Sequence, residues 1–195
     1  MADRSGGVAR TDVTAADGAA ADPRVIGSIQ PIPGPAPPDD LAATAKGRPL
    51  WLCPRCGHRF VSANIWHSCS RHDVDEHFNR TLPSVRAAFD RLLELYERCG
   101  PVVVIAQKTR IVFMVRVRFG GCIVRRDRLL TGISLARRID DARWTSVDEV
   151  APGWWGHRFE VRSAEELNDP VLAELICESY HAIGQQGRLA TRRRR

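Results

Sequence analysis

Three cysteines and one histidine are grouped in the segment LWLCPRCGHRFVSANIWHSC. Cys53 and Cys56 have two residues between them, and His67 and Cys69 follow after ten more. Two thiolates at the first spacing can both reach one tetrahedral ion, and Gly57 permits the tight turn that this requires. Residues i and i+2 lie on one side of an extended strand, so His67 and Cys69 can face the same ion. The four residues therefore predict a Zn²⁺ site.

This ligand set is closed, because three sulfurs and one imidazole fill the four positions of a tetrahedral zinc ion. We therefore expect a structural zinc ion, which does not activate water. Such an ion supplies folding free energy of roughly 10–16 kcal/mol in zinc-finger peptides, far more than a segment of this length gains from its own core. Trp51, Phe60, Ile65 and Trp66 are predicted to pack around the ion or onto the main domain. An exposed Trp66 could instead stack on a nucleic-acid base.

A rival assignment replaces Cys69 with His72 as the fourth ligand. It approximates a finger of two cysteines and two histidines, with a central spacing two residues shorter than the usual twelve. The sequence that follows His72, DVDEHF, resembles the approach to a helix more than the inside of a finger helix. The Cys69 assignment is therefore preferred, and both the His72 assignment and the absence of any metal remain open.

Composition divides the chain into four segments. Residues 1–47 are rich in Ala, Gly, Asp and Pro, and the run IQPIPGPAPPDD excludes both a helix and a central strand. We expect this arm to be disordered. Residues 48–72 are the zinc ribbon, residues 73–187 are the main domain, and residues 188–195 are a basic tail.

The main domain begins and ends with helical patterns, and the region between them has the composition of β-strands. Apolar residues recur at the helical period over 77–99 and again over 167–183. Strands are predicted at 102–106, 110–119, 122–126, 129–136 and 157–162, with a turn at Gly120–Gly121. This order predicts an α+β fold, a two-layer sandwich in which helices flank an antiparallel sheet of four to five strands.

The charge is positive and unevenly distributed. The formal net charge is +6 and the pI is about 9.4. Residues 108–128 carry seven Lys or Arg residues and a single acid, and the chain ends in four arginines. Such surfaces attract anions, nucleic acid above all. In the strand predicted at 110–119, the odd-numbered residues are apolar and would face the helices, whereas the opposite face would be half open, partly apolar and basic.

An anion site on that face would use Lys108, Arg116, Arg118 and His157. The alternative is a solvated sheet surface on which His157 only caps a strand. Cys99, Cys122 and Cys177 are interpreted as separate thiols. Since the N-terminus has no apolar signal segment and no run reaches the ~20 apolar residues of a membrane span, we expect a cytoplasmic protein with reduced cysteines.

The sequence resembles an uncharacterised bacterial domain family of unknown function. The resemblance spans roughly residues 50–184 and rests on W-x-CPxCG, on HSC, on HF opening a helix, and on Gly-Pro-Val before a hairpin with Lys108, Ile111 and Phe113. The later LARR, His157 and Tyr180 fit the same pattern. Some members are labelled predicted transport proteins, and no activity is established for the family. The resemblance implies an α+β fold related to small bacterial domains whose sheet is like that of the TATA-binding protein.

Three functional hypotheses follow. The first is a non-catalytic, zinc-headed module whose basic sheet face binds nucleic acid or another polyanion. The second is a small-molecule-binding domain or enzyme that uses Lys108, Arg116 and His157 in a pocket. The third is a protein-interaction adaptor that docks a partner through the zinc unit.

Overall fold

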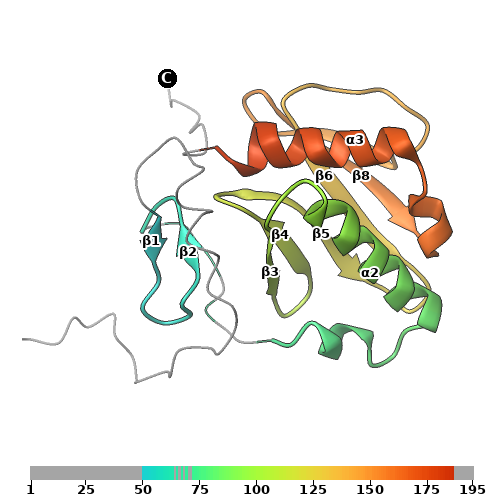
Figure 1. Ribbon diagram of the computed structural model, residues 1–195, viewed down its shortest axis with the longest axis horizontal. Coiled ribbons are helices and arrows are strands. Elements are labelled where there is room, and N and C mark those ends of the chain that lie inside the picture. Colours follow the sequence, from blue (N-terminus) through green and yellow to red (C-terminus); the bar gives the residue numbers. More distant parts are fainter. Residues whose placement is uncertain (1–49, 64, 66, 68, 70–71, 187–195) are drawn as a thin grey trace, which may run out of the picture.

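A computed structural model describes residues 50–63, 65, 67, 69 and 72–186 (Figure 1). The arm predicted to be disordered, the basic tail and Trp66 lie outside these residues. A small two-stranded unit, the head, stands beside a larger α+β domain. The head contains β1 (Trp51–Leu52) and β2 (Arg59–Phe60), which pair antiparallel.

The larger domain is built on a six-stranded sheet in which every neighbouring pair is antiparallel. In spatial order the strands are β3 (Val103–Ala106), β4 (Ile111–Met114), β5 (Arg118–Val124), β6 (Leu129–Leu135), β8 (Trp154–Val161) and β7 (Ser146–Ala151). The α+β class and the antiparallel sheet are confirmed, and the sheet has more strands than predicted. β7 was not predicted. It is an edge strand with exposed acids, and its sequence SVDEVA lacks the apolar alternation of a half-buried strand.

The predicted strand 110–119 is wrong in its length, because the chain leaves the sheet between β4 and β5. The backbone N–H groups of Arg116 and Val117 donate to the carbonyl oxygen of Gly184, at 2.9 and 3.1 Å. Gly184 lies far from these residues in the sequence, so local alternation could not predict this contact. The turn predicted at Gly120–Gly121 is also wrong, since both glycines lie inside β5.

Two helices cover one face of the sheet (Figure 1). Helix α2 (Pro83–Glu97) begins later than predicted, because a residue before proline avoids the helical region and Leu82 is extended. A short 3₁₀ turn, η1 (Asp75–Phe78), precedes it. Helix α3 (Pro170–Glu178) lies within the predicted helical segment 167–183, and Asp169 caps it by accepting from the N–H groups of Val171 and Leu172. A second 3₁₀ turn, η2 (Ala164–Leu167), precedes α3, and a π-helical turn, η3 (Ser179–Gly184), follows it.

The main core lies between the helices and the sheet. Ile111, Phe113 and Phe119 are fully buried there, as their alternation predicted. The rings of Tyr96 on α2 and Phe113 lie 4.5 Å apart between centroids. On the opposite face, Val112 and Met114 are also buried, because the head packs on them. The prediction of a half-open second face is therefore wrong over β4.

His157 belongs to the core and is fully buried. Its Nδ1–H donates to the Trp155 carbonyl oxygen at 3.1 Å, and its Nε2 accepts from the Ile139 N–H at 3.0 Å. The ring meets Trp144 edge to face, with 5.1 Å between centroids. Both nitrogens are thus used in the neutral state, and burial lowers the pKa of His157 below its ordinary value.

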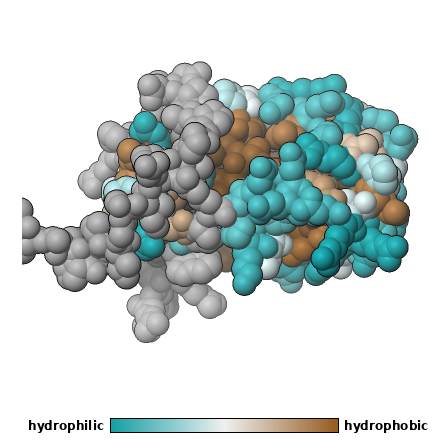
Figure 2. Space-filling model, turned by 90° about the horizontal axis from the view of Figure 1, so that it is seen from below, coloured by the Kyte–Doolittle hydropathy of each residue, from teal (hydrophilic) through white to brown (hydrophobic). Residues whose placement is uncertain are grey.

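Hydrophilic residues cover much of the surface seen in Figure 2, with apolar areas between them. The large apolar side chains with the greatest exposure in the described residues are Leu52, Leu82, Val150 and Val171. They come from separate elements and form no continuous stripe along one helix or strand. Among the described residues, no helix combines the length and the apolar character needed to cross a membrane.

Two of the cysteines interpreted as separate thiols are joined. Cys99, just after α2, and Cys177, on α3, form a disulfide that closes a sequence separation of 78 residues. The expectation of reduced, unpaired thiols is therefore wrong for this pair. Spacing could not reveal the bond, since the packing of α3 beside the end of α2 brings the two Cα atoms to 5.1 Å. Cys122 remains a buried free thiol.

The disulfide should contribute measurably to stability, since a crosslink across a long loop lowers the entropy of the unfolded chain. We expect Cys177→Ser to lower the free energy of unfolding by roughly 2–4 kcal/mol in urea titrations. Adding a phosphine reductant should destabilise the wild-type protein and the control variant Cys122→Ala by this amount. The same reductant should leave Cys177→Ser unchanged. Equal midpoints for the oxidised and reduced wild type would contradict the prediction.

Burial of neutral His157 also predicts a pH dependence. In the unfolded chain the imidazole protonates as the pH falls through its ordinary pKa of 6.5, whereas the folded protein keeps it neutral. Stability that is present above pH 6.5 is therefore lost as the pH falls toward the lower folded pKa. Between pH 7.5 and 5, His157→Gln should lose roughly 1 kcal/mol less unfolding free energy than the wild type. Parallel pH curves for the two proteins would refute this.

Candidate metal centre

The turn between β1 and β2 positions the first two candidate ligands. Trp51 pairs with Phe60 in this small ladder. Beyond β1, the Cys53 N–H donates to the His58 carbonyl oxygen, and the Gly57 N–H donates to the Cys53 carbonyl oxygen, both at 2.9 Å. Gly57 has φ of 73°, a conformation that suits glycine. The turn therefore holds the thiols of Cys53 and Cys56 on the same side.

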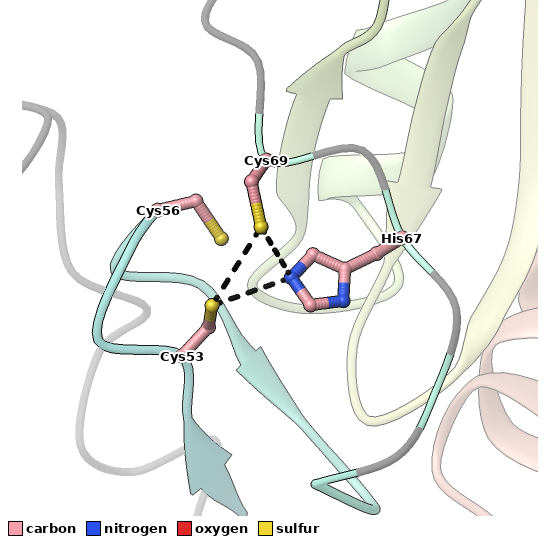
Figure 3. A group of neighbouring side chains, drawn as sticks. All are labelled: Cys53, Cys56, His67 and Cys69. Carbon is pink, nitrogen blue, oxygen red and sulfur yellow. Dashed lines mark hydrogen bonds between the residues drawn. The ribbon is translucent and has the colours of Figure 1, made fainter. Parts of the chain in front are cut away.

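The second pair of ligands reaches the same point from the segment after β2. The donor atoms of Cys53, Cys56, His67 and Cys69 all lie within 4.8 Å of one another (Figure 3). His67 Nε2 is 3.3 Å from Cys53 Sγ and 3.2 Å from Cys69 Sγ, and the two sulfurs are 3.9 Å apart. Ligands of a tetrahedral zinc ion, with Zn–S of 2.3 Å, are about 3.5–3.8 Å from one another. The cluster therefore has the dimensions of a four-ligand metal site.

The tautomer of His67 suits ligation. Its Nδ1–H donates to the Ile65 carbonyl oxygen at 2.9 Å, which leaves the Nε2 lone pair for a metal. Metal-bound histidines usually donate their second ring N–H in this way, since the bond fixes the ring and raises its basicity. The ring also lies against Phe60, with 4.2 Å between centroids.

The three thiols have different affinities for protons. Burial raises the pKa of Cys53, but hydrogen bonds from the backbone of Cys56 and Arg55 oppose this effect, and the value is about 6. Burial raises the pKa of Cys56 to about 12 and also raises that of Cys69. Because only thiolates bind metal, an entering divalent ion displaces protons from the latter two.

The structure supports the Cys69 assignment over the rival one. The cluster that could hold a metal contains Cys69, and His72 is not part of it. The imidazole of His72 instead lies beside Glu76, with Nδ1 3.8 Å from a carboxylate oxygen. The part of the chain that the structure describes thus contains one group of four soft donors with metal-site spacing.

The head is joined to the sheet by an apolar cluster. Cys53, Cys56 and Phe60 share this cluster with Ile105 of β3 and with two residues of β4, Val112 and Met114. Trp51 and Ile65 pack against its margin, as predicted, whereas Trp66 lies outside the described residues. Two candidate ligands thus belong to the same buried cluster as the sheet residues, so the candidate metal site is continuous with the contact between the head and the sheet.

The residues predicted to bind an anion do not share one surface. Lys108 is exposed in the turn between β3 and β4, and Arg118 is exposed at the start of β5. Arg116 is buried, and burial lowers its pKa. The side chain of His157 lies in the core, as described above. Of the four, only Arg118 presents its charge on the outer face of the sheet, where the structure has a hollow.

That hollow has a volume of about 580 Å³ and lies over β5, β6 and β8, beside the part of the sheet that the head covers. Its lining includes Arg110, Arg118 and Arg158, with Gly121, Gly132 and Gly156 from three different strands. Alternation had placed Arg110 on this face without identifying it as a site residue. Arg158 was missed, although its position next to the inward-facing His157 places it outward in β8.

Metal binding gives a direct test of the cluster. The wild-type protein should bind one Zn²⁺ per chain, and a strong chelator should lower its thermal midpoint by several degrees, because the head loses its crosslink. Cys69→Ser should bind the ion far more weakly, while the control His72→Ala should still bind one ion. Elemental analysis and calorimetric melting measure both effects. A metal-free wild type, or full binding by Cys69→Ser, would refute the assignment.

A family model described as a domain of unknown function, DUF5655, matches residues 74–182. The match covers more than half of the chain and extends from η1 into η3 of the α+β domain, with the four candidate metal ligands outside it. No curated protein and no solved structure matches the chain significantly. The expected membership in an uncharacterised family is thus confirmed for the α+β domain, and the chain belongs to the DUF5655 family.

Proposed function

We propose that this protein is a non-catalytic binding module, in which a structural zinc ion keeps the head on the sheet and the basic outer face binds an anionic ligand. The ligand class includes nucleic acid and other polyanions. The proposal has two parts, the metal and the face, which rest on different observations.

Zinc is the ion that suits the donor set best. Three thiolates and one imidazole are soft ligands with tetrahedral spacing, which favours zinc over magnesium, calcium or manganese. The four donors leave no position for a water molecule or substrate. The docking of Cys53 and Cys56 against Val112 and Met114 further supports a structural role, since the ion would hold an apolar contact closed.

One observation carries the anion-binding part. Of the three arginines that line the hollow, Arg158 pairs with Asp148 at 2.9 Å, whereas Arg110 and Arg118 have no acidic partner among the described residues. Desolvation by the surrounding protein atoms and the positive charge of Arg110 both lower the pKa of Arg118, although its side chain still reaches solvent. Two guanidinium groups that repel each other attract an anion more strongly than either alone.

The chemistry of the hollow supports binding without catalysis. Cys122 and His157 line it, but burial raises the pKa of the Cys122 thiol to about 12, and the His157 imidazole is held in the core. Neither group can attack a ligand or exchange a proton with it from these positions. Small-molecule binding is the second candidate, because a hollow of about 580 Å³ is in the size range of ligand pockets.

Anion binding can be tested with a fluorescein-labelled single-stranded oligonucleotide and with unlabelled small anions as competitors. We expect affinity to decrease as salt increases, since cations on the protein release counterions. Arg118→Glu should weaken binding about tenfold, because it replaces attraction with repulsion in the hollow. The exposed residue Arg80, which does not line the hollow, provides the control Arg80→Glu. Absence of binding by every anion at low salt would sink the proposal.

A further inference from the structure

The two sides of the hollow differ in charge. Arg110 and Arg118 stand on the side of β4 and β5, and both side chains are exposed. On the side of β7 and β8, Arg158 is neutralised by Asp148, and Glu160 also lines the wall. Positive charge without a partner is therefore confined to one side.

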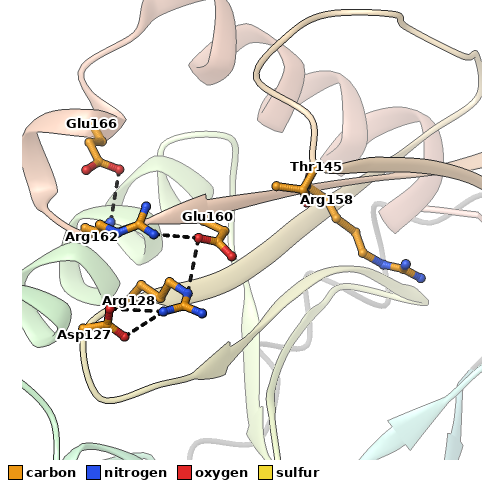
Figure 4. A network of polar contacts seen from close by, with 7 residues as sticks. All are labelled: Asp127, Arg128, Thr145, Arg158, Glu160, Arg162 and Glu166. Carbon is orange, nitrogen blue, oxygen red and sulfur yellow. Dashed lines mark hydrogen bonds and ion pairs between the residues drawn. The ribbon is translucent and has the colours of Figure 1, made fainter.

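Figure 4 shows the polar contacts of Glu160, on the β7 and β8 side of the hollow. Glu160 forms ion pairs with Arg128 and Arg162, with N–O distances of 3.2 and 2.9 Å. Arg128 also binds Asp127, whereas the side chain of Arg158 points away from this network. Arg128 and Arg162 are thus engaged by carboxylates and do not add positive charge that a ligand could use.

The floor of the hollow is short of side chains for a structural reason. Gly121 and Gly132 face each other across β5 and β6. A methyl group on Gly121 would lie 2.6 Å from the Ile111 carbonyl oxygen, and one on Gly132 would lie 2.7 Å from the His157 carbonyl oxygen. Such contacts are too short for any larger residue, so close strand approach requires glycine here. The bare floor therefore leaves space for a ligand.

Aliphatic residues complete the lining. Ile123 on β5 and Leu130 on β6 are half-buried neighbours in the ladder, and both line the hollow together with Val150 of β7. They give the middle of the hollow an apolar character. A ligand that fits has a charged group at one end and an uncharged body beside it.

We infer that the hollow binds a compact organic anion, whose phosphate or carboxylate lies between Arg110 and Arg118 and whose uncharged body lies over the glycine floor. This inference rests on the proposed anion-binding function and narrows its ligand. Each planar guanidinium can donate two parallel hydrogen bonds to either kind of anion. The volume of about 580 Å³ suits one small molecule.

A polymer fits the same charges poorly. A polyanion that crossed the strands from Arg118 toward β7 would approach the carboxylates of Glu160 and Asp148. Like charges at short range oppose such a path. The described lining also lacks an exposed aromatic ring on which successive bases could stack, since Phe159 is buried in the core.

The experiment compares five probes by isothermal titration calorimetry on the metal-loaded full chain. Adenosine 5′-monophosphate and hexanoate are compact organic anions that distinguish phosphate from carboxylate. Adenosine lacks the charge, inorganic phosphate lacks the body, and a 20-nucleotide single strand represents the polymer. At least one organic anion should bind about tenfold more tightly than adenosine, inorganic phosphate and, per chain, the oligonucleotide.

Variants then locate the site. Arg110→Gln and Arg118→Gln should each weaken the preferred anion about tenfold, because each removes one charged fork. Arg126→Gln is the matched control, since Arg126 is exposed in the β5–β6 turn and does not line the hollow. All three changes are on the surface, and melting curves verify that the variants fold.

The possible failures are distinct. If the oligonucleotide binds more tightly than both organic anions, the compact-ligand inference is overturned while the proposed function stands. If inorganic phosphate binds as tightly as the organic anions, the uncharged body adds no affinity and the inference of a compact organic ligand is overturned. If Arg126→Gln weakens binding as much as Arg118→Gln, the hollow is not the site and the inference is overturned as well. If no anion binds, both the inference and the proposed function fail.

Discussion

The burial of β4 on both faces is the constraint on which the rest of the structure depends. Ile111 and Phe113 lie under the helices, whereas Val112 and Met114 lie under the head. A strand that is apolar on both sides loses burial on one side whenever the head separates, at roughly 25 cal/mol per Å² of apolar surface. The head has too little core of its own to hold this position, and in the proposed function a metal ion bound by the four candidate ligands would stabilise it there.

The same arrangement explains where the outer face is free. The head covers β3 and β4, and the hollow begins beside it, over β5, β6 and β8. Arg110 directly precedes β4 and Arg118 pairs with Met114 at its other end, so the basic side of the hollow lies beside the strand that the head covers. The candidate metal ligands, the apolar docking of the head and the basic residues are therefore linked through β4. The disulfide at the end of α2 crosslinks the opposite, helical layer.

Local patterns predicted those features that depend on neighbouring residues. The knuckle of Cys53 and Cys56 and the second ligand pair could be assigned from spacing, because one short turn and one extended segment suffice to build such a site. The helical periods and the alternation of 111–119 likewise identified the core. Arg116 and His157 were misplaced for the opposite reason. Basic and titratable residues are usually exposed, so a sequence pattern places them on the surface, and only the packing around Arg116 and His157 shows that both are buried.

The sequence by itself thus determined the α+β class, the antiparallel sheet, the residues of the core face and the four candidate ligands. The tertiary structure alone decided the break between β4 and β5, the Cys99–Cys177 bond and the hollow with Arg110 and Arg158. Periodicity records which way a side chain points relative to its neighbours in the chain. It carries no information on which distant element packs against that side chain. Each of these three features requires contact between segments that are far apart in sequence.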